Sequence, residues 1–382
     1  MPVQARLLAG VLIAGALAAC SSTPVRPKPG PLPALPGAPV VLQKSWSVRV
    51  GDAALPDDAV ALRPATAGAV TLAASADGVL TAIGDDGKVL WRDKTGLALT
   101  GGVAAGYGRV AAGTVKGQLG VWQVSDGKPV WTANLSAAVL APPAITADKV
   151  IVKTNDGRVT ALDALTGKPS WTYDTPVPAL SLRGYAPPLV HNDLLLVPTS
   201  VGKVVALAAD TGIGQWEVQV AAPKGRTEIE RLVDIDGDLA VTADGKLVVA
   251  GYQGQLSALQ LGEHPDPLWD IDTSSLGGVA VDSANAYFAD TDGKVRAVDL
   301  VTGKVIWKQE ALAWRQLSNV VLLGDALAVG DEQGYLHLLS SSDGRILGRA
   351  RTRGPVTRLE AVNGRLLAST RSGTVSTWRL ER

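Results

Sequence analysis

A glycine-led unit of about 40 residues recurs eight times and constrains this chain more than any other feature of its sequence. Each unit opens on a glycine, continues as a short strand-like run, turns, and in most cases reaches a tryptophan. The opening glycines are Gly78, Gly117, Gly157, Gly202, Gly254, Gly293, Gly334 and Gly373. Successive glycines lie 39, 40, 45, 52, 39, 41 and 39 residues apart. A period near 40 with several short strands per unit is typical of a β-propeller.

The third unit shows how one blade is built. Val159 and Ala161 alternate with polar neighbours, which is the pattern of a half-buried strand. Gly167 lies in a Thr-Gly-Lys sequence that favours a hairpin turn, and Trp171 follows where the next strand starts. A lone blade cannot bury both of its faces, so the blades must stack around an axis with the tryptophans between them. We therefore expect an all-β fold over residues 41–382, an eight-bladed β-propeller of four-stranded antiparallel blades.

The two chain ends are expected to close the ring. Tryptophan occupies the repeat position in six units, as Trp91, Trp131, Trp171, Trp216, Trp269 and Trp307. The seventh unit has Gly348 there, and the eighth ends at Arg382 without room for a last strand. Trp46 stands alone near the amino terminus, so this N-terminal strand is predicted to pair with the last blade and complete it. A seven-bladed ring with a stray terminal hairpin is the alternative.

The first twenty residues carry a targeting signal. An apolar run ends in Leu-Ala-Ala-Cys at residues 17–20, which is similar to the lipobox of bacterial lipoproteins. This resemblance implies that residues 1–19 are a signal peptide and that Cys20, the only cysteine, is lipidated. An ordinary secretory signal with a chance cysteine is the alternative. Ser21 follows, rather than the aspartate that commonly retains lipoproteins in the inner membrane, so the resemblance points to the outer membrane.

Residues 20–40 form a proline-rich tether in this interpretation. Seven prolines lie between Pro24 and Pro39, and prolines at this density exclude a helix or a central strand. We expect an extended, polyproline-like spacer that holds the folded body away from the membrane surface.

The sequence offers little chemistry. Lys plus Arg and Asp plus Glu both number 36, so the net charge is zero, which argues against a nucleic-acid partner bound through bulk positive charge. The histidines, His191, His264 and His337, fall in different units, so we expect no shared metal site. None of the familiar nucleophile, phosphate-loop or zinc-protease motifs occurs. We expect neither a cofactor nor enzymatic activity.

One enzymatic alternative arises from the repeat itself. The sequence from Ala161 to Trp171 resembles the tryptophan-docking motif of quinoprotein alcohol dehydrogenases. Those enzymes also carry an adjacent pair of cysteines and a calcium site, whereas this chain has a single cysteine. The resemblance therefore covers the scaffold, and a quinoprotein-dehydrogenase-like propeller is kept as an alternative.

Two consecutive connections between blades depart from the repeat. Counted from each tryptophan to the next opening glycine, the intervals are 26, 26, 31, 38, 24 and 27 residues. Because antiparallel strands alternate in direction, connections between successive blades all emerge on one face, so the two long ones should lie side by side. The first contains Leu180, Leu182 and Arg183, and the second contains Asp234 and Asp236. Leu and Ile in long loops are costly unless they pack or bind, although ordinary solvated loops are the alternative.

The lipobox, the linker, the eight blades and two loop motifs together resemble the BamB family, the propeller lipoproteins of the machinery that assembles outer-membrane β-barrels. The loop motifs are Leu-Ser-Leu-Arg-Gly at residues 180–184 and Thr-Glu-Ile-Glu-Arg-Leu-x-Asp-x-Asp at residues 227–236. The resemblance implies a scaffold at the periplasmic face of the outer membrane that binds the POTRA domains of the barrel-forming subunit and supports folding and insertion of barrels, with unfolded outer-membrane proteins as further partners. Carried over by position, the contact residues are Leu180, Leu182, Arg183, Asp234 and Asp236. A propeller that binds peptidoglycan or another periplasmic ligand is the remaining alternative.

Overall fold

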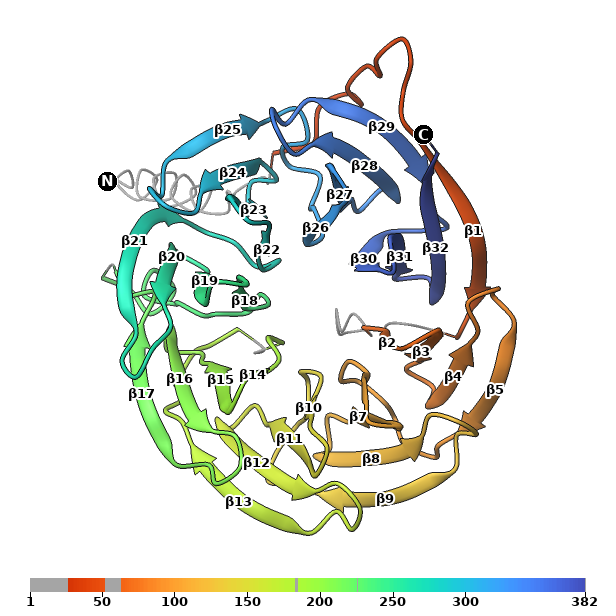
Figure 1. The fold of residues 1–382 in the computed structure, drawn as a ribbon, viewed down its shortest axis with the longest axis vertical. Coiled ribbons are helices and arrows are strands. Elements are labelled where there is room, and N and C mark those ends of the chain that lie inside the picture. The colour runs from red at the N-terminus through yellow and green to blue at the C-terminus, as the bar shows by residue number, and fades with distance from the viewer. Residues whose placement is uncertain (1–26, 52–62, 183–184, 225, 382) are drawn as a thin grey trace, which may run out of the picture.

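The repeats fold into eight four-stranded antiparallel sheets arranged around a central axis (Figure 1). The computed structural model describes residues 27–51, 63–182, 185–224 and 226–381. Within these ranges the secondary structure consists of strands and turns, and no helix is long and apolar enough to span a membrane. The predicted all-β, eight-bladed propeller is confirmed. The predicted signal peptide of residues 1–19 and the lipidated Cys20 lie outside the described residues.

In each of the first seven blades the four strands follow one another in the chain, from the axis outward. The strands of the first four blades are β2 (Ala65–Ala67), β3 (Val70–Ala74), β4 (Val79–Ile83) and β5 (Val89–Lys94); β6 (Ala104–Gly106), β7 (Arg109–Gly113), β8 (Gln118–Gln123) and β9 (Pro129–Asn134); β10 (Ala144–Ile145), β11 (Lys149–Lys153), β12 (Arg158–Asp163) and β13 (Pro169–Asp174); β14 (Leu189–His191), β15 (Leu194–Pro198), β16 (Lys203–Ala208) and β17 (Gly214–Gln219).

The remaining blades keep this order, except that the eighth uses both chain ends. Their strands are β18 (Ala240–Val241), β19 (Lys246–Ala250), β20 (Gly254–Gln260) and β21 (Asp266–Thr273); β22 (Ala280–Val281), β23 (Asn285–Ala289), β24 (Val295–Asp299) and β25 (Val305–Gln309); β26 (Val320–Leu323), β27 (Ala326–Gly330), β28 (Tyr335–Ser340) and β29 (Ile346–Arg351); β30 (Val356–Val362), β31 (Arg365–Thr370), β32 (Thr374–Glu381) and β1 (Val41–Arg49).

Strand β1 closes the ring by pairing with β32. The two strands run antiparallel, with Trp46 opposite Thr377 and Val48 opposite Val375. Sheet order in this blade is β1-β32-β31-β30, so the outermost strand comes from the amino terminus. The predicted closure is confirmed, and it leaves no blade without its fourth strand.

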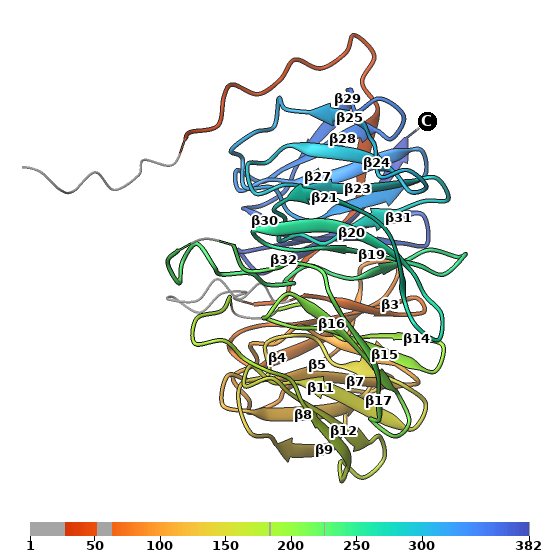
Figure 2. The same ribbon diagram turned by 90° about the vertical axis from the view of Figure 1, so that its left-hand side faces the viewer.

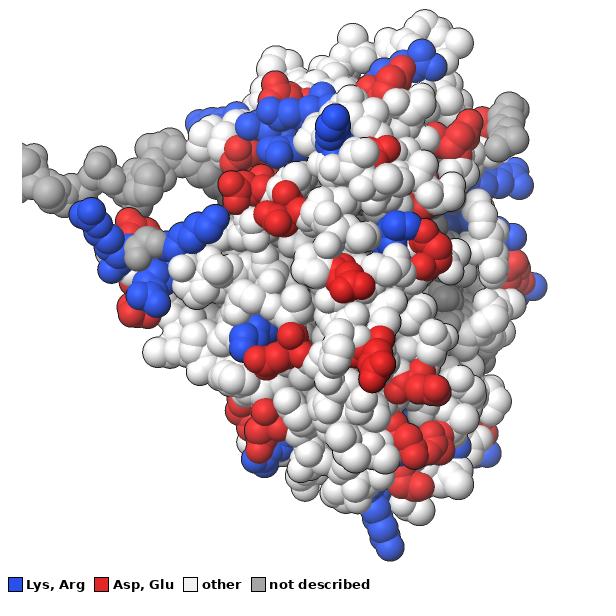
Figure 3. All heavy atoms as spheres, turned by 60° about the vertical axis from the view of Figure 1, so that its left-hand side comes forward, with Lys and Arg blue, Asp and Glu red and all other residues white. Residues whose placement is uncertain are grey.

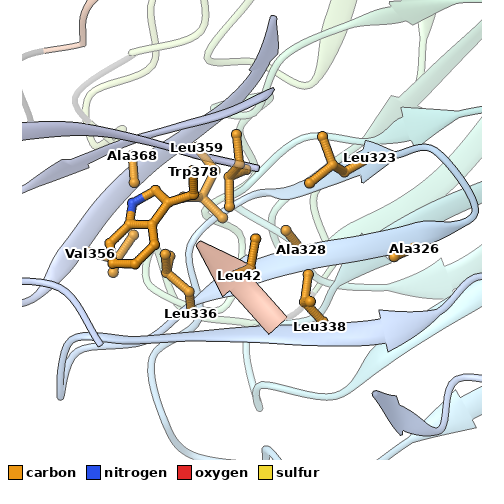
Figure 4. Close-up of a cluster of buried hydrophobic side chains, with 11 residues drawn as sticks. Leu42, Leu323, Ala326, Ala328, Leu336, Leu338, Val356, Leu359, Ala368 and Trp378 are labelled. Atoms are coloured by element: carbon orange, nitrogen blue, oxygen red, sulfur yellow. The ribbon is translucent and has the colours of Figure 1, made fainter. Parts of the chain in front are cut away.

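Buried clusters join the blades to each other. Among the described residues there are eight hydrophobic clusters, and each combines side chains from two adjacent blades. Figure 4 shows the one between the last two blades, where Leu336 and Leu338 from β28 meet Leu359 and Trp378 from the eighth blade and Leu42 from β1. The core is therefore a circular series of inter-blade contacts, as stacking of half-buried sheets requires.

The repeat tryptophans add a second contact between blades. Trp91 packs on the next hairpin turn, where a Cβ added at Gly127 would lie 2.6 Å from the indole ring. The indole N–H of Trp91 donates to the backbone oxygen of Val124 at 2.9 Å. Trp46 makes the same contact with the first blade, donating to the oxygen of Asp85 at 3.1 Å. The turn position favours glycine because the ring covers it and φ is positive, +72° at Gly127.

Gly348 breaks the tryptophan pattern for a topological reason. Five repeat tryptophans pack on the turn that joins the third and fourth strands of the next blade: Trp91, Trp131, Trp171, Trp269 and Trp307. In the eighth blade these two strands are the two chain ends. No turn exists there for a tryptophan at position 348 to cover. The backbone of Val40 occupies this place instead, so close that a Cβ on Gly348 would collide with its carbonyl oxygen. The N–H of Val40 donates to the oxygen of Leu347 at 2.9 Å.

Candidate protein-binding face

The two long connections lie side by side on one face of the ring, as their place in the topology predicts. The first runs from the end of β13 to the start of β14, and the second from the end of β17 to the start of β18. They touch directly: the backbone N–H of Tyr185 in the first donates to a carboxylate oxygen of Asp236 in the second, at 2.6 Å. Figure 2 shows both connections extending from the same side of the ring.

The first connection presents a leucine to solvent. The side chain of Leu180 is 44% exposed, whereas Leu182 is half-buried. Arg183, the third residue expected in this segment to bind a partner, lies outside the described residues. The structure thus places Leu180 on the surface and leaves the contact roles of all three residues as predictions.

The second connection carries an ordered turn at its tip. The carboxylate of Glu230 accepts hydrogen bonds from the N–H groups of Arg226, at 2.7 Å, and Thr227, at 3.1 Å. The N–H of Glu230 in turn bonds the Thr227 hydroxyl at 3.2 Å, which completes a capping box. This turn displays Ile229, whose side chain is 71% exposed. Sequence reasoning did not select Ile229 as a site residue, although the Thr-x-x-Glu spacing was a usable signal for a structured turn.

Asp234 lies beneath this surface. The residue is 1% exposed, and its backbone oxygen accepts the N–H of Tyr252 at 2.8 Å. Burial, reinforced by the nearby carboxylate of Asp236, raises the pKa of Asp234 to about 7, although the ammonium of Lys153 opposes the shift. Lys153 is itself buried, and its Nζ donates to the backbone oxygen of Pro198 at 3.0 Å. Asp234 was predicted as a contact residue, and the structure gives its carboxylate no direct access to a partner.

Asp236 links the two connections rather than facing outward. It is half-buried, and its carboxylate holds the backbone of Tyr185. Burial raises the pKa of Asp236, while the hydrogen bond from Tyr185 and the charge of Lys153 act in the opposite direction. The arrangement of Asp236 between the loops therefore fixes the position of the first connection relative to the second.

Asp238 anchors the end of the second connection across the central axis. Its carboxylate oxygens accept hydrogen bonds from Arg63, both at 2.7 Å, and pair with Arg358. Arg63 precedes the first blade and Arg358 lies in β30 of the eighth, whereas Asp238 leads into the fifth blade. Burial alone would raise the pKa of Asp238, but the charges of Arg358 and Arg63 outweigh it and lower the pKa to about 2. A cavity of about 240 Å³ lies beside this cluster, partly lined by Tyr185.

The aspartates of this face make structural contacts within the ring. Among the described residues, no group of three or more His, Cys, Asp or Glu side chains is placed to hold a metal ion. His337 is buried in the seventh blade, where it bonds Asp331 at 3.0 Å, and the other two histidines lie elsewhere in the ring. Figure 3 shows basic and acidic side chains interspersed over the visible surface, without a broad region of one sign. The distinctive features of this face are exposed apolar side chains on connections that are fixed from below.

Comparison with known proteins gives a consistent family. The family model described as outer membrane protein assembly factor BamB matches residues 76–309 and 292–381. Proteins of that name are 46% identical in Pseudomonas aeruginosa, over 82% of this chain and 82% of the relative, and 45% identical in Marinobacter adhaerens, over 97% and 95%. The Escherichia coli protein of that name is 32% identical over 98% of this chain and 99% of its own length.

Solved structures agree on the fold. The crystal structure of BamB from Moraxella catarrhalis superposes with a TM-score of 0.82 and 33% identity, covering 89% of this chain and all of that one. A quinohemoprotein alcohol dehydrogenase from Comamonas testosteroni gives a TM-score of 0.67 at 16% identity, covering 88% of this chain and 76% of the enzyme. The second likeness shows a shared propeller fold and carries no information about activity.

Proposed function

We propose that this chain, which belongs to the BamB family of outer membrane protein assembly factors, is a non-enzymatic scaffold that binds the POTRA domains of the barrel-forming subunit through its long connections. Its role lies in outer-membrane protein assembly, in association with the outer membrane. In the proposal, a lipid on Cys20 holds the propeller at the periplasmic face of that membrane. Bound to the subunit, the propeller keeps the machinery in a geometry that supports folding and insertion of barrels, with unfolded clients as further ligands.

The observation that carries the proposal is the rigid display of apolar side chains. Leu180 and Ile229 are exposed, yet the connections that bear them are held by Asp236 and Asp238 from within the ring. An apolar side chain on a preordered surface binds a partner without the entropic cost of ordering a flexible loop. Energetically dominant contacts in protein interfaces are few, apolar or arginine-based, and surrounded by polar groups. This face has that composition.

The five predicted contact residues then divide into two groups. Leu180 and Leu182 supply apolar surface, and Arg183 supplies a charge that sets the orientation of the partner. Asp234 and Asp236 act beneath the surface, on the shape of the connections. In this proposal, replacing an aspartate affects binding through loop geometry, whereas replacing Leu180 removes a contact.

Co-purification with the barrel-forming subunit tests the proposal. Leu180→Ala should weaken binding by about 2 kcal/mol, or roughly 30-fold, if the side chain is a central contact. Leu165→Ala is the matched control, because Leu165 is also an exposed leucine, 69% accessible, in a hairpin turn on the opposite face. Both variants should keep the thermal stability of the wild type, since exposed substitutions usually change it by about 0.5 kcal/mol or less.

Two further variants sharpen the same experiment. Arg183→Glu should reduce co-purification, whereas Lys168→Glu, a charge reversal on the opposite face, should leave it unchanged. Full recovery of the subunit with both Leu180→Ala and Arg183→Glu would show that the partner binds elsewhere on the propeller. Retention of peptidoglycan or a quinone by the purified chain, with no subunit recovered, would favour one of the two alternative functions.

A further inference from the structure

The proline-rich segment before β1 lies against the propeller rather than apart from it. From residue 27 to residue 40 the chain forms no strand, yet it makes specific contacts with the seventh blade. The guanidinium of Arg315 donates to the backbone oxygen of Gly30, and that of Arg349 donates to the oxygen of Pro33, both at 2.7 Å. Leu32 and Pro33 are half-buried, whereas residues 34–39 are exposed. Figure 1 shows this segment leaving β1, looping outward and returning beside the seventh blade.

The two arginines belong to a structured, largely buried site. Arg315 is 3% exposed, pairs with the carboxylate of Asp331 at 3.3 Å and bonds the side-chain oxygen of Gln333 at 2.9 Å. Asp331 is fully buried and also bonds His337 at 3.0 Å. Arg349 lies over the ring of Tyr335, with its guanidinium carbon 5.8 Å from the ring centre. The donors are thus held in place by the blade itself.

Two residues of this site, His337 and Arg349, occupy repeat positions at which the third unit has different residues. His337 and Arg349 are the third and fifteenth residues after the opening glycine of their unit, where the third blade has Thr160 and Thr172. Burial lowers the pKa of His337, which favours its neutral form. Two guanidinium groups therefore face one carboxylate, and the surplus positive charge is directed at backbone carbonyl oxygens. The site is specific to the seventh blade and is not a general property of the propeller.

A proline-rich chain is a suitable occupant for such a site. Its prolines have no N–H to donate, and an extended polyproline conformation leaves every carbonyl oxygen free to accept. Arg315 and Arg349 provide the donors, and the segment Pro29–Pro33 provides the acceptors.

We propose that the seventh blade carries a binding site for the chain's own segment Pro29–Pro33, and that this site fixes where the tether leaves the propeller. The donors to Gly30 and Pro33 come from Arg315, in the connection between the sixth and seventh blades, and Arg349 in β29. That connection lies on the same face as the two long connections, because it also joins successive blades. The tether therefore departs from the face proposed to bind the partner, and Figure 2 shows it running toward that side.

The consequence for anchoring rests on the proposed lipidation of Cys20. An extended proline-rich chain advances ~3.1 Å per residue, so a free tether from Cys20 to Val41 would reach about 65 Å. With Pro29 held on the blade, the free part ends there and reaches only about 28 Å. Docking would shorten the permitted distance between the lipid and the propeller by more than half. It would also keep the face that carries the long connections on the side of the propeller from which the lipid-bearing end of the tether departs.

Distance measurements between spin labels test the docking without reference to any partner. In a mature chain carrying Cys20→Ala, the replacements Lys28→Cys and Ser342→Cys introduce two labels, one on the tether and one on the turn before β29. A second chain has residues 29–35 replaced by Gly and Ser at equal length. The docked chain should give one narrow distance distribution, whereas the Gly-Ser chain should give a spread on the order of 10 Å, as expected for a flexible linker.

Two further measurements, on an arginine variant and on diluted label, test the docking contact and whether it forms within one chain. Arg349→Ala should broaden the distribution while the thermal melt stays close to that of the wild type, and this variant avoids disturbing the buried Arg315. Dilution with unlabelled protein should leave the narrow distribution unchanged. A wild-type distribution as broad as that of the Gly-Ser chain would overturn the proposal. So would broadening on dilution, since the site would then be filled by the tether of a second copy.

Failure of this proposal is separable from failure of the proposed function. Leu180→Ala should lose the barrel-forming subunit and keep the narrow distance, because residue 180 does not touch the tether site. The Gly-Ser chain, solubilised in detergent, should lose the narrow distance and still co-purify with the subunit. A Gly-Ser chain with the narrow wild-type distance would show that Pro29–Pro33 is not what the site holds.

Discussion

Replacing Asp234 by asparagine should make the stability of the propeller less sensitive to pH. The pKa of Asp234 is raised from 3.8 to about 7 by burial. Between these two values the folded chain keeps a proton that the unfolded chain releases, so this group stabilises the fold fully below pH 3.8. The contribution decreases as pH rises and is lost above pH 7. An asparagine side chain at this position would be neutral throughout and would not show this loss.

The magnitude follows from the size of the shift. One pKa unit corresponds to 1.36 kcal/mol, so a shift from 3.8 to about 7 represents about 4 kcal/mol. Part of this is offset in the variant, because the buried ammonium of Lys153 loses a nearby negative charge. We therefore expect the difference in free energy of unfolding between Asp234→Asn and wild type to shift by about 2 kcal/mol in favour of the variant when the pH is raised from 5 to 8.

Urea unfolding at pH 5 and pH 8 is the appropriate assay, since the midpoint and slope give the free energy of unfolding at each pH. Asp163→Asn is the control: Asp163 is a partly exposed aspartate whose pKa is held below its usual value by hydrogen bonds from Thr166, so it is ionised at both pH values. A stability difference between Asp234→Asn and wild type that is equal at pH 5 and pH 8 would refute the reasoning. Faster dissociation of the partner from a fully stable Asp234→Asn, with association unchanged, would argue for direct contact.

Three further outcomes follow from the contacts between blades and across the axis. Trp131→Phe should cost about 1 kcal/mol more than Trp171→Phe in urea unfolding, because the Trp131 indole N–H bonds Ala164 at 3.0 Å and that of Trp171 has no described acceptor. Trp46→Ala should lower stability by about 3–5 kcal/mol, measured by thermal unfolding, since it empties a buried site that closes the ring. Wild type should gain about 2 kcal/mol in its free energy of unfolding from ionised Asp238 above pH 4, and should lose this contribution as the pH falls toward 2. Asp238→Asn should lack the contribution at every pH, which acid unfolding would measure.

The ring could be predicted from the sequence because its information is repeated. Each unit repeats the same pattern of strand, turn glycine and tryptophan, so the number of blades can be counted even where one unit is irregular. The repeat also made it possible to predict how the ring closes. Trp46 belongs to none of the eight units, and the eighth unit lacks one strand. The adjacent position of the two long connections followed from strand alternation alone.

The docking of the tether could not be predicted in this way. The prolines correctly indicate an extended chain, but the partners of that chain, Arg315 and Arg349, follow it by about 300 residues. Nothing local distinguishes an arginine that binds a carbonyl from one that faces solvent. Gly348 was visible as an irregularity, and its cause, the entry of Val40 at a blade without a closing turn, required the arrangement in space.

The three alternating aspartates of the second connection show the same limit at the proposed site. The sequence analysis predicts Asp234 and Asp236 as contact residues for a partner, and Asp238 continues the same alternation. Their roles instead depend on distant groups: Lys153 below the first, the backbone of Tyr185 beside the second, and Arg63 with Arg358 across the axis from the third.

The hydrogen bonds of Asp236 and Asp238 restrain the connection from inside the ring, and a segment restrained from inside presents a defined outer surface. The binding energy of such a surface then resides in its exposed apolar residues, Leu180 and Ile229, and the carboxylates determine how rigidly they are presented. Variants of the two groups should therefore differ in kind. Loss of a leucine should accelerate dissociation, because a formed contact is missing. Loss of an aspartate should slow association, because the competent shape of the loops is populated for less of the time.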